Sequence, residues 1–261
     1  MLQFRFALIT ASVVVGLFLG MLFFLELGRR FGLRQLGRKG TDARVGVGVV
    51  DSIVYGLLGL LIGFTFSGAA TRFDHRRELV AQEVNAIGTA WQRLDLLPAE
   101  PQSALRSGFR RYVDELLTSY ANPASSADPY REPIPVTRAQ NDIWARAVAA
   151  CTAPSGEQAR MLVLPALNEM FGIVESERMA RRMHPPMVIF VMLGLTALAA
   201  AMFAGYGIAS GPTRNWIYLL GIAATISSSA YVIADLEYPR LGLIRIDAID
   251  QALVELRATM K

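Results

Sequence analysis

The chain has 261 residues, enough for one or two soluble domains, yet 53% of them are hydrophobic and mean hydropathy is +0.36. Charged residues make up 18%, below the roughly 25% of soluble domains, which argues against a purely soluble fold. The net charge of +4 comes from arginines beside apolar blocks, without a basic face of interleaved aromatics, so we expect no nucleic-acid partner. A single cysteine, Cys151, excludes an internal disulfide framework.

Four apolar blocks are each close to the roughly 20 residues that a helix needs to cross a bilayer. We predict membrane spans at about residues 6–27, 45–70, 187–209 and 216–234. Only helices satisfy the backbone of such stretches in lipid, so the predicted fold is an all-α membrane protein. Its four transmembrane helices form two hairpins, residues 1–71 and 187–235. The first block exceeds a signal-peptide core and has no small-residue cleavage site after it, so we expect a retained span.

Residues 72–186, between the second and third spans, are charged and have amphipathic helical patterning, which predicts a helical extramembrane domain. The second span is expected to continue as a helix from Arg72 to about Leu97, because nothing breaks it before Pro98. A second helix, over residues 101–120, would bury one apolar face. That face consists of Leu105, Phe109, Tyr112, Val113, Leu116 and Leu117.

The second half of this domain is punctuated by loop and capping signals. The Pro-, Ser- and Ala-rich stretch 122–136 predicts a loop, and Thr137 with Gln140 has the spacing of a capping box that opens a helix. A long helix is expected from residue 155 or 156 to about 183, ended by the two prolines before the third span. Residues 236–261 are predicted to contain a C-terminal amphipathic helix.

Basic residues flank both sides of the predicted membrane. The loop between the first two spans is rich in arginine, which by the positive-inside rule would place it in the cytoplasm. The opposite side is no less basic, with Arg72, Arg76 and Arg77 after the second span and further arginines before the third. These residues alone leave the orientation undecided.

No arrangement of residues typical of a catalytic site occurs in the sequence. Neither His75 nor His184 has a second His or Cys at ligand spacing, so we expect no metal site. No phosphate-binding loop, nucleophile elbow or dinucleotide fingerprint occurs. We therefore predict that the protein is not an enzyme and has no cofactor.

Polar residues in or beside the spans are the main candidates for function. Asp51 lies in the second span, where a carboxylate is costly unless it meets water or a partner; it is either an interfacial residue or an intramembrane acid with a pore or ion role. A second candidate is a charge network at the membrane boundary, with a solvated surface as the alternative. Its members would be Arg72, Arg76, Arg77, Asp235, Glu237 and Arg240.

Two segments carry a family resemblance. In residues 59–90, Gly63-Phe64 is followed by Arg72-Phe73 and then by Arg76 and Arg77; the other segment is Asp-Leu-Glu-Tyr-Pro-Arg-Leu-Gly at 235–242. The sequence resembles the bacterial bestrophin-like family of four-span membrane proteins over most of its length. It is more distantly similar to the bestrophin channels, over about thirty residues.

The resemblance implies a pentamer with the second span of each subunit around a central ion pathway. The three apolar rings of the bestrophin neck would correspond to Gly56, Leu60 and Phe64, of which the last two suit a constriction that gates by dewetting. Gly56 departs from the pattern and implies a wider outer neck. The acidic cluster that binds calcium in animal bestrophins has no clear counterpart. The resemblance also implies a bacterial inner membrane and a cytoplasmic middle domain, against the basic first loop.

The leading hypothesis is thus a homo-oligomeric ion channel in the lipid bilayer, with an unspecified permeant ion. The alternative is a non-conducting membrane scaffold whose helical domain binds a partner protein. In that case the second span would pack against its neighbours without a pore.

Overall fold

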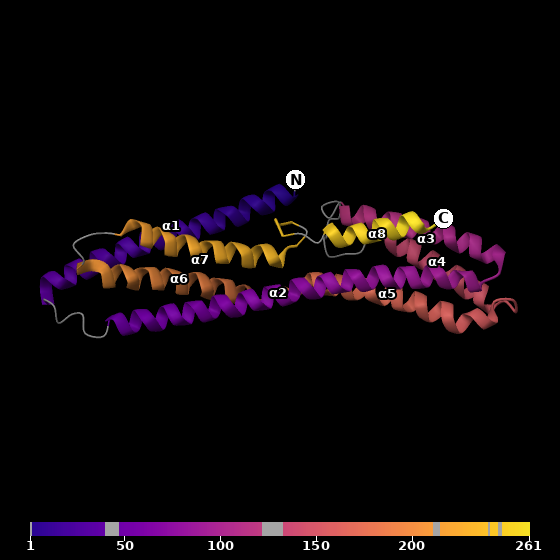
Figure 1. Cartoon of the computed structure of the whole chain (residues 1–261), viewed down its shortest axis with the longest axis horizontal. Helices are drawn as coiled ribbons and strands as arrows, with labels where there is room; N and C mark the ends of the chain where they lie inside the picture. The colour runs from indigo at the N-terminus through magenta and orange to yellow at the C-terminus, as the bar shows by residue number, and fades with distance from the viewer. Residues whose placement is uncertain (1, 40–46, 122–132, 211–214, 240, 245–246) are drawn as a thin grey trace. The chain divides into compact units, whose positions relative to one another are not determined.

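The computed structural model describes residues 2–39, 47–121, 133–210, 215–239, 241–244 and 247–261, and these ranges contain helices and turns but no strand (Figure 1). Contacts divide the chain into two compact units. The membrane unit comprises Met1–Thr71 and Pro185–Ile244, and the helical unit comprises Arg72–His184 and Arg245–Lys261.

The membrane unit contains α1 (Leu2–Lys39), the first part of α2 (Val47–Arg93), α6 (Met187–Gly207) and α7 (Trp216–Glu237). Four helical segments of the described chain are long and apolar enough to cross a membrane, and their apolar stretches lie in these helices. The all-α class with four candidate spans is therefore confirmed. Helix α1 packs against both α6 and α7.

Two glycines allow α1 and α6 to pack with their backbones in close contact. A Cβ atom on Gly28 would lie 1.9 Å from the carbonyl oxygen of Met202, and one on Gly205 would lie 1.9 Å from that of Leu25. Any larger residue would force the two helices apart, which is the usual role of small residues between membrane helices.

The helical unit contains the polar end of α2, followed by α3 (Ala99–Ala121), α4 (Ile134–Thr152), α5 (Arg160–Arg182) and α8 (Asp247–Thr259). Helix α2 continues without a break as far as Arg93, as its sequence predicts, and a 3₁₀ turn at Leu94–Leu96 follows. Helix α3 packs on α4 and α8, and α4 packs on α5.

The core of the helical unit forms around the apolar face predicted for α3. Leu105, Phe109, Tyr112, Val113 and Leu116 are buried, and Leu117 packs partly buried against them. The same core encloses Cys151, and this burial raises the pKa of its thiol, although the charge of Arg160 acts in the opposite direction.

The predicted start of α4 is wrong. The helix begins at Ile134, three residues before Thr137, so Thr137 lies inside it and is not its N-cap. Pro133 occupies the cap and Pro135 lies in the first turn, where a helix requires no backbone N–H donor. The loop expected over 122–136 therefore extends too far, and residues 122–132 lie outside the described ranges.

Prolines also set the end of α5 and the start of α6. Met183 ends α5, and Pro186 is the N-cap of α6, as the two-proline signal predicts. At the other end, a 3₁₀ turn at Glu157–Ala159 precedes α5, so this helix begins slightly later than expected. After α7, residues 238–239 and 241–244 lie outside any helix, and α8 begins only at Asp247.

Candidate functional site

The apolar half of α2 (residues 47–71) has two different faces. At 100° per residue, Asp51, Tyr55 and Leu58 lie on one side of the helix. This side faces the other helices of the membrane unit, and Leu58 is fully buried. Leu60 and Phe64 lie on the opposite side and are 54% and 68% exposed.

The exposed face contains the three residues that the resemblance assigns to a constriction. Gly56, Leu60 and Phe64 recur every four residues and are all exposed. Nothing among the described residues lies within 4 Å of a Cβ atom built on Gly56, Gly59 or Gly63. This apolar, glycine-containing surface therefore has no partner within the described part of its own subunit, and lipid or another copy must cover it.

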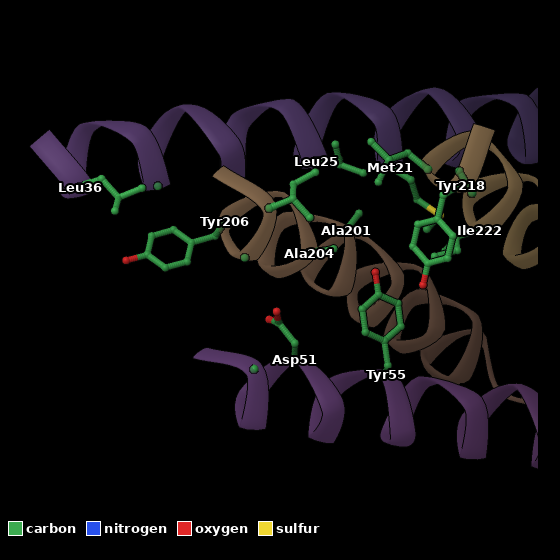
Figure 2. Close-up of a pocket in the computed structure, with 16 residues that line it drawn as sticks. Met21, Leu25, Leu36, Asp51, Tyr55, Ala201, Ala204, Tyr206, Tyr218 and Ile222 are labelled. Carbon is green, nitrogen blue, oxygen red and sulfur yellow. The ribbon is translucent and has the colours of Figure 1, made fainter. Parts of the chain in front are cut away.

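The packed face of α2 borders a cavity of about 520 Å³ in the membrane unit (Figure 2). All four helices of the unit contribute to its wall. Met21, Leu25 and Leu36 come from α1, Asp51 and Tyr55 from α2, Ala201 and Tyr206 from α6, and Tyr218 and Ile222 from α7. Among the described residues, the wall is therefore mostly apolar, with one carboxylate and three tyrosine rings.

Asp51 is directed into this cavity and not toward the exposed face of α2 (Figure 2). Its Oδ1 atom is shielded from solvent and has no hydrogen-bond partner among the described residues. The neighbouring helix leaves room for the carboxylate, because a Cβ atom on Gly207 would lie 2.7 Å from Oδ2. Sequence reasoning identified Asp51 but not the cavity or its tyrosines; only the four-residue spacing to Tyr55 could have indicated one of them.

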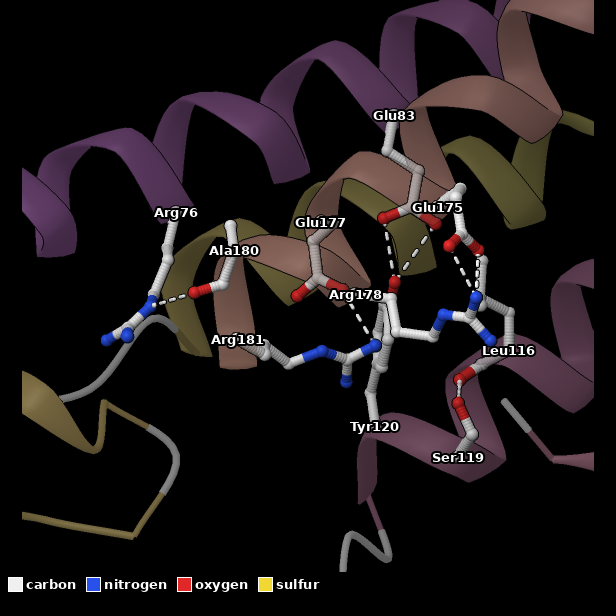
Figure 3. A network of polar contacts seen from close by, with 10 residues as sticks. All are labelled: Arg76, Glu83, Leu116, Ser119, Tyr120, Glu175, Glu177, Arg178, Ala180 and Arg181. Atoms are coloured by element: carbon white, nitrogen blue, oxygen red, sulfur yellow. Dashed lines mark hydrogen bonds and ion pairs between the residues drawn. The ribbon is translucent and has the colours of Figure 1, made fainter. Parts of the chain in front are cut away.

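Arg76 is the buried member of the arginine group that follows the apolar half of α2. Its guanidinium donates a hydrogen bond to the carbonyl oxygen of Ala180 at 3.2 Å (Figure 3). It donates another to the carbonyl oxygen of Met183 at 2.9 Å. These carbonyls lie at the C-terminus of α5, where backbone acceptors exceed the donors of the helix. The Ala180 carbonyl also accepts the backbone N–H of Met183 at 3.3 Å, so Arg76 supplies it with a second donor. Arg76 thus caps α5 within the helical unit.

The two neighbouring arginines have different surroundings. Arg77 is exposed, lies over the ring of Phe73 and approaches Asp74 at 3.6 Å, a surface pair that contributes little to stability. Arg72 is half-buried and has contacts of its own.

Buried carboxylates in the helical unit were not predicted. Glu83 is fully buried, and the hydroxyl of Tyr120 donates to its two carboxylate oxygens at 2.7 and 3.0 Å (Figure 3). Glu177 is also buried and pairs with Arg181 at 2.7 Å. Glu83 could have been found from the sequence, because it interrupts the apolar stripe of α2 that includes Ile87.

At the end of α7, the carboxylate of Asp235 organises the following turn. It accepts backbone N–H bonds from Leu243, at 2.9 and 3.0 Å, and from Ile244, at 2.7 Å. A Cβ atom on Gly242 would lie 2.1 Å from Oδ1, so the carboxylate fills the space that a side chain there would need. Part of the 235–242 segment is therefore explained by local structure.

The predicted boundary network divides between the two units. Asp235 and the buried Glu237 belong to the membrane unit, whereas Arg72, Arg76 and Arg77 belong to the helical unit. Arg240 lies outside the described residues. Contact between the two groups remains a prediction. Across the described ranges, no group of three His, Cys, Asp or Glu residues is arranged to hold a metal ion.

Comparison with family models gives a match over most of the chain, and comparison with solved structures gives a shared fold. The profile of the Bestrophin-like domain matches residues 15–249, whereas no curated protein matches the sequence. The structural alignment with a point mutant of a bacterial bestrophin homologue from Klebsiella pneumoniae covers 92% of this chain and 98% of the homologue. The TM-score is 0.65 and the sequence identity is 18%. Another crystal structure of such a homologue, solved by Zn-SAD phasing, covers 91% and 98%, with TM-score 0.60 and 17% identity. Identities this low demonstrate a shared fold only.

Proposed function

The chain belongs to the bestrophin-like family, and from this premise we propose that it forms an oligomeric ion channel with α2 of each subunit around a central pathway. The observation that carries the proposal is the exposed face of α2. Leu60 and Phe64 point away from the rest of their own unit, as residues lining a shared pore would. The family resemblance favours five subunits.

Leu60 and Phe64 are proposed to form the narrow part of this pathway. Rings of bulky apolar side chains can close a pore to ions by dewetting, without blocking it sterically. Gly56 lies one turn earlier on the same face and contributes no side chain, so the pathway would be wider there. The absence of a neighbour around Gly56 within the described chain is compatible with this position.

We also propose a bacterial inner membrane and a cytoplasmic helical unit. The family resemblance supports this orientation, as do the arginines around residues 72–77 and 178–182. The arginine-rich segment after the first span is the feature that opposes it. Reaction of an introduced cysteine at exposed Asp74 with a membrane-impermeant thiol reagent, in intact cells and in lysed cells, would decide between the two orientations.

The channel is tested by ion flux into liposomes that contain the purified full-length protein. Leu60→Ala and Phe64→Ala should increase flux by widening and wetting the constriction. Leu19→Ala is the matched control, because Leu19 is 57% exposed but lies on α1. Wild-type protein without flux for any monovalent ion, together with silent Leu60→Ala and Phe64→Ala variants, would overturn the proposal.

A non-conducting scaffold is the second candidate, favoured by apolar side chains exposed on the helical unit. Ile134 is 65% exposed and Met161 78% exposed, so this unit has surface that a partner protein could cover. Oligomeric state in detergent distinguishes the candidates. A symmetric ring with a central hole supports the channel, and a monomer or dimer supports the scaffold.

A further inference from the structure

We propose that the cavity on the packed side of α2 binds an ammonium group attached to an apolar body. This site lies inside one subunit, on the face of α2 opposite Leu60 and Phe64, so it is distinct from the proposed pore. The inference does not depend on whether the protein conducts ions.

The volume of the cavity indicates the size of the ligand. About 520 Å³ falls within the roughly 300–1,000 Å³ typical of small-molecule sites and is far larger than a bare metal ion requires. The apolar side chains of Met21, Leu25 and Ile222 form much of the wall. An occupant therefore gains most from an apolar body of several carbon atoms.

The charge of the cavity indicates the polar group of that ligand. Asp51 is the one acidic residue on the described wall, and no Lys, Arg or His accompanies it there. Its Oδ1 atom has no hydrogen-bond partner among the described residues, although it is shielded from solvent. A carboxylate in such a place requires a donor or a cation, and an ammonium group supplies both.

Three tyrosines make the site suited to ammonium in particular. The ring of Tyr55 lies one helical turn from Asp51 on the same face of α2, and Tyr206 and Tyr218 contribute from α6 and α7 (Figure 2). The faces of aromatic rings attract organic cations, so rings around a carboxylate favour ammonium over a neutral ligand of the same shape. Tyr218 is positioned by the first turn of α7, where the side chain of Asn215 accepts the Tyr218 backbone N–H at 3.2 Å.

The cavity lies close to helix ends, which gives it access from the surface region of the membrane. Asp51 is in the second turn of α2, Gly207 is the last residue of α6, and Tyr218 is in the first turn of α7. At that depth an ammonium group can come from a soluble amine or from an amine-bearing lipid headgroup. The recognition chemistry is the same for both.

Equilibrium dialysis of the purified full-length protein in detergent against labelled phenethylammonium tests the site, with protein-free micelles as background. We expect 2-phenylethanol, its neutral counterpart, to bind at least about ten-fold more weakly. Asp51→Asn should weaken ammonium binding by about ten-fold or more, whereas Asp74→Asn, an exposed acid outside the cavity, should leave it unchanged. Tyr55→Phe should retain binding, and Tyr55→Leu should weaken it about three- to ten-fold.

A second arm separates the two sources of the ammonium group. The same titration is made in nanodiscs of phosphatidylglycerol with and without phosphatidylethanolamine. Competition by phosphatidylethanolamine supports the lipid headgroup as occupant, and its absence supports a soluble amine. Equal binding of the ammonium and alcohol probes, or unchanged ammonium binding by Asp51→Asn, would overturn the proposal. Neither result depends on ion flux, so failure here is distinguishable from failure of the channel proposal.

Discussion

The two halves of α2 belong to one uninterrupted helix but are buried in different ways. The polar half, residues 72–93, places Ala86, Ile87 and Ala90 in the core of the helical unit and caps α5 through Arg76. In the apolar half, Ile53 and Leu60 remain largely exposed within the described chain.

This contrast reverses what hydropathy alone would suggest. The more polar segment finds its apolar partners within its own subunit, because one of its faces packs into the core of the helical unit. The more apolar segment relies on surroundings outside the subunit, either lipid or neighbouring copies. In a membrane protein, a leucine that is exposed in a single chain therefore marks surface that lipid or another subunit covers, and not surface that meets water.

The largest test of this contrast is Ile87→Ala compared with Ile53→Ala. Ile87 is fully buried, so truncation should cost about 2–5 kcal/mol in the free energy of unfolding of the helical unit. Ile53 is 64% exposed, and its truncation in detergent should change that free energy by less than about 0.5 kcal/mol. Alkylation of the buried Cys151, the single cysteine, reports opening of the unit. Equal alkylation rates in the two variants would contradict the contrast.

The buried carboxylate of the polar half provides the second test. Tyr120→Phe removes the hydroxyl that donates to Glu83 and should cost about 1–3 kcal/mol in unfolding free energy, because it leaves a buried acceptor without this donor. In a Glu83→Gln background the same change should cost less. Chemical denaturation of the four variants in this cycle measures the coupling. Additive effects would show that the hydrogen bond does not couple the two residues.

Two glycines allow a packed face and an exposed face of the membrane unit to be compared. Gly205→Ala places a Cβ atom against the α1 backbone and should destabilise the unit by about 1–3 kcal/mol. Gly56→Ala meets nothing within 4 Å in the described chain and, as a helical glycine, should gain up to about 1 kcal/mol in a monomeric sample. Thermal unfolding in detergent, followed by circular dichroism, compares the two. A loss for Gly56→Ala would instead indicate close packing with another copy.

The docking of α8 should depend only slightly on its ion pair. The guanidinium of Arg257 makes two hydrogen bonds with Asp114 on α3, at 2.7 and 2.9 Å, and these raise the pKa of Arg257. Both partners are partly exposed, so Asp114→Asn should cost about 0.2–1 kcal/mol, and less at high salt. Hydrogen exchange of α8 amides measures the change. A loss of all protection in α8 would show that the pair, and not Leu253, holds the helix.

The smallest effect concerns alkaline pH. Burial raises the pKa of the Cys151 thiol in the folded chain, so the unfolded chain loses this proton first as pH rises. The protonated thiol of Cys151 contributes its full share to the free energy of unfolding below the pKa that it has in the unfolded chain. That contribution is lost as pH rises through the higher pKa of the thiol in the folded chain. Cys151→Ser should flatten the pH dependence of unfolding above about pH 8.5. An unchanged slope would contradict this origin.

The sequence predicts the helices well because their signals are local. Apolar length defines the spans, and the face of α3 from Leu105 to Leu116 follows from helical spacing. The start of α4 was missed because Pro133 and Pro135 open the helix better than the capping-box residues do. The Asp51 cavity could not be predicted, since packing alone brings Tyr206 and Tyr218, from distant parts of the chain, to the same cavity as Asp51.

The turn after α7 has a consequence for how this sequence can change over time. Asp235 and Gly242 occupy the same space: any side chain at 242 would collide with the carboxylate, and loss of the carboxylate would leave the amides of Leu243 and Ile244 without their acceptor. Neither position can be replaced alone without harm. Among related sequences the two residues should therefore change together, so that their correlated variation would identify this turn even where the neighbouring residues have diverged.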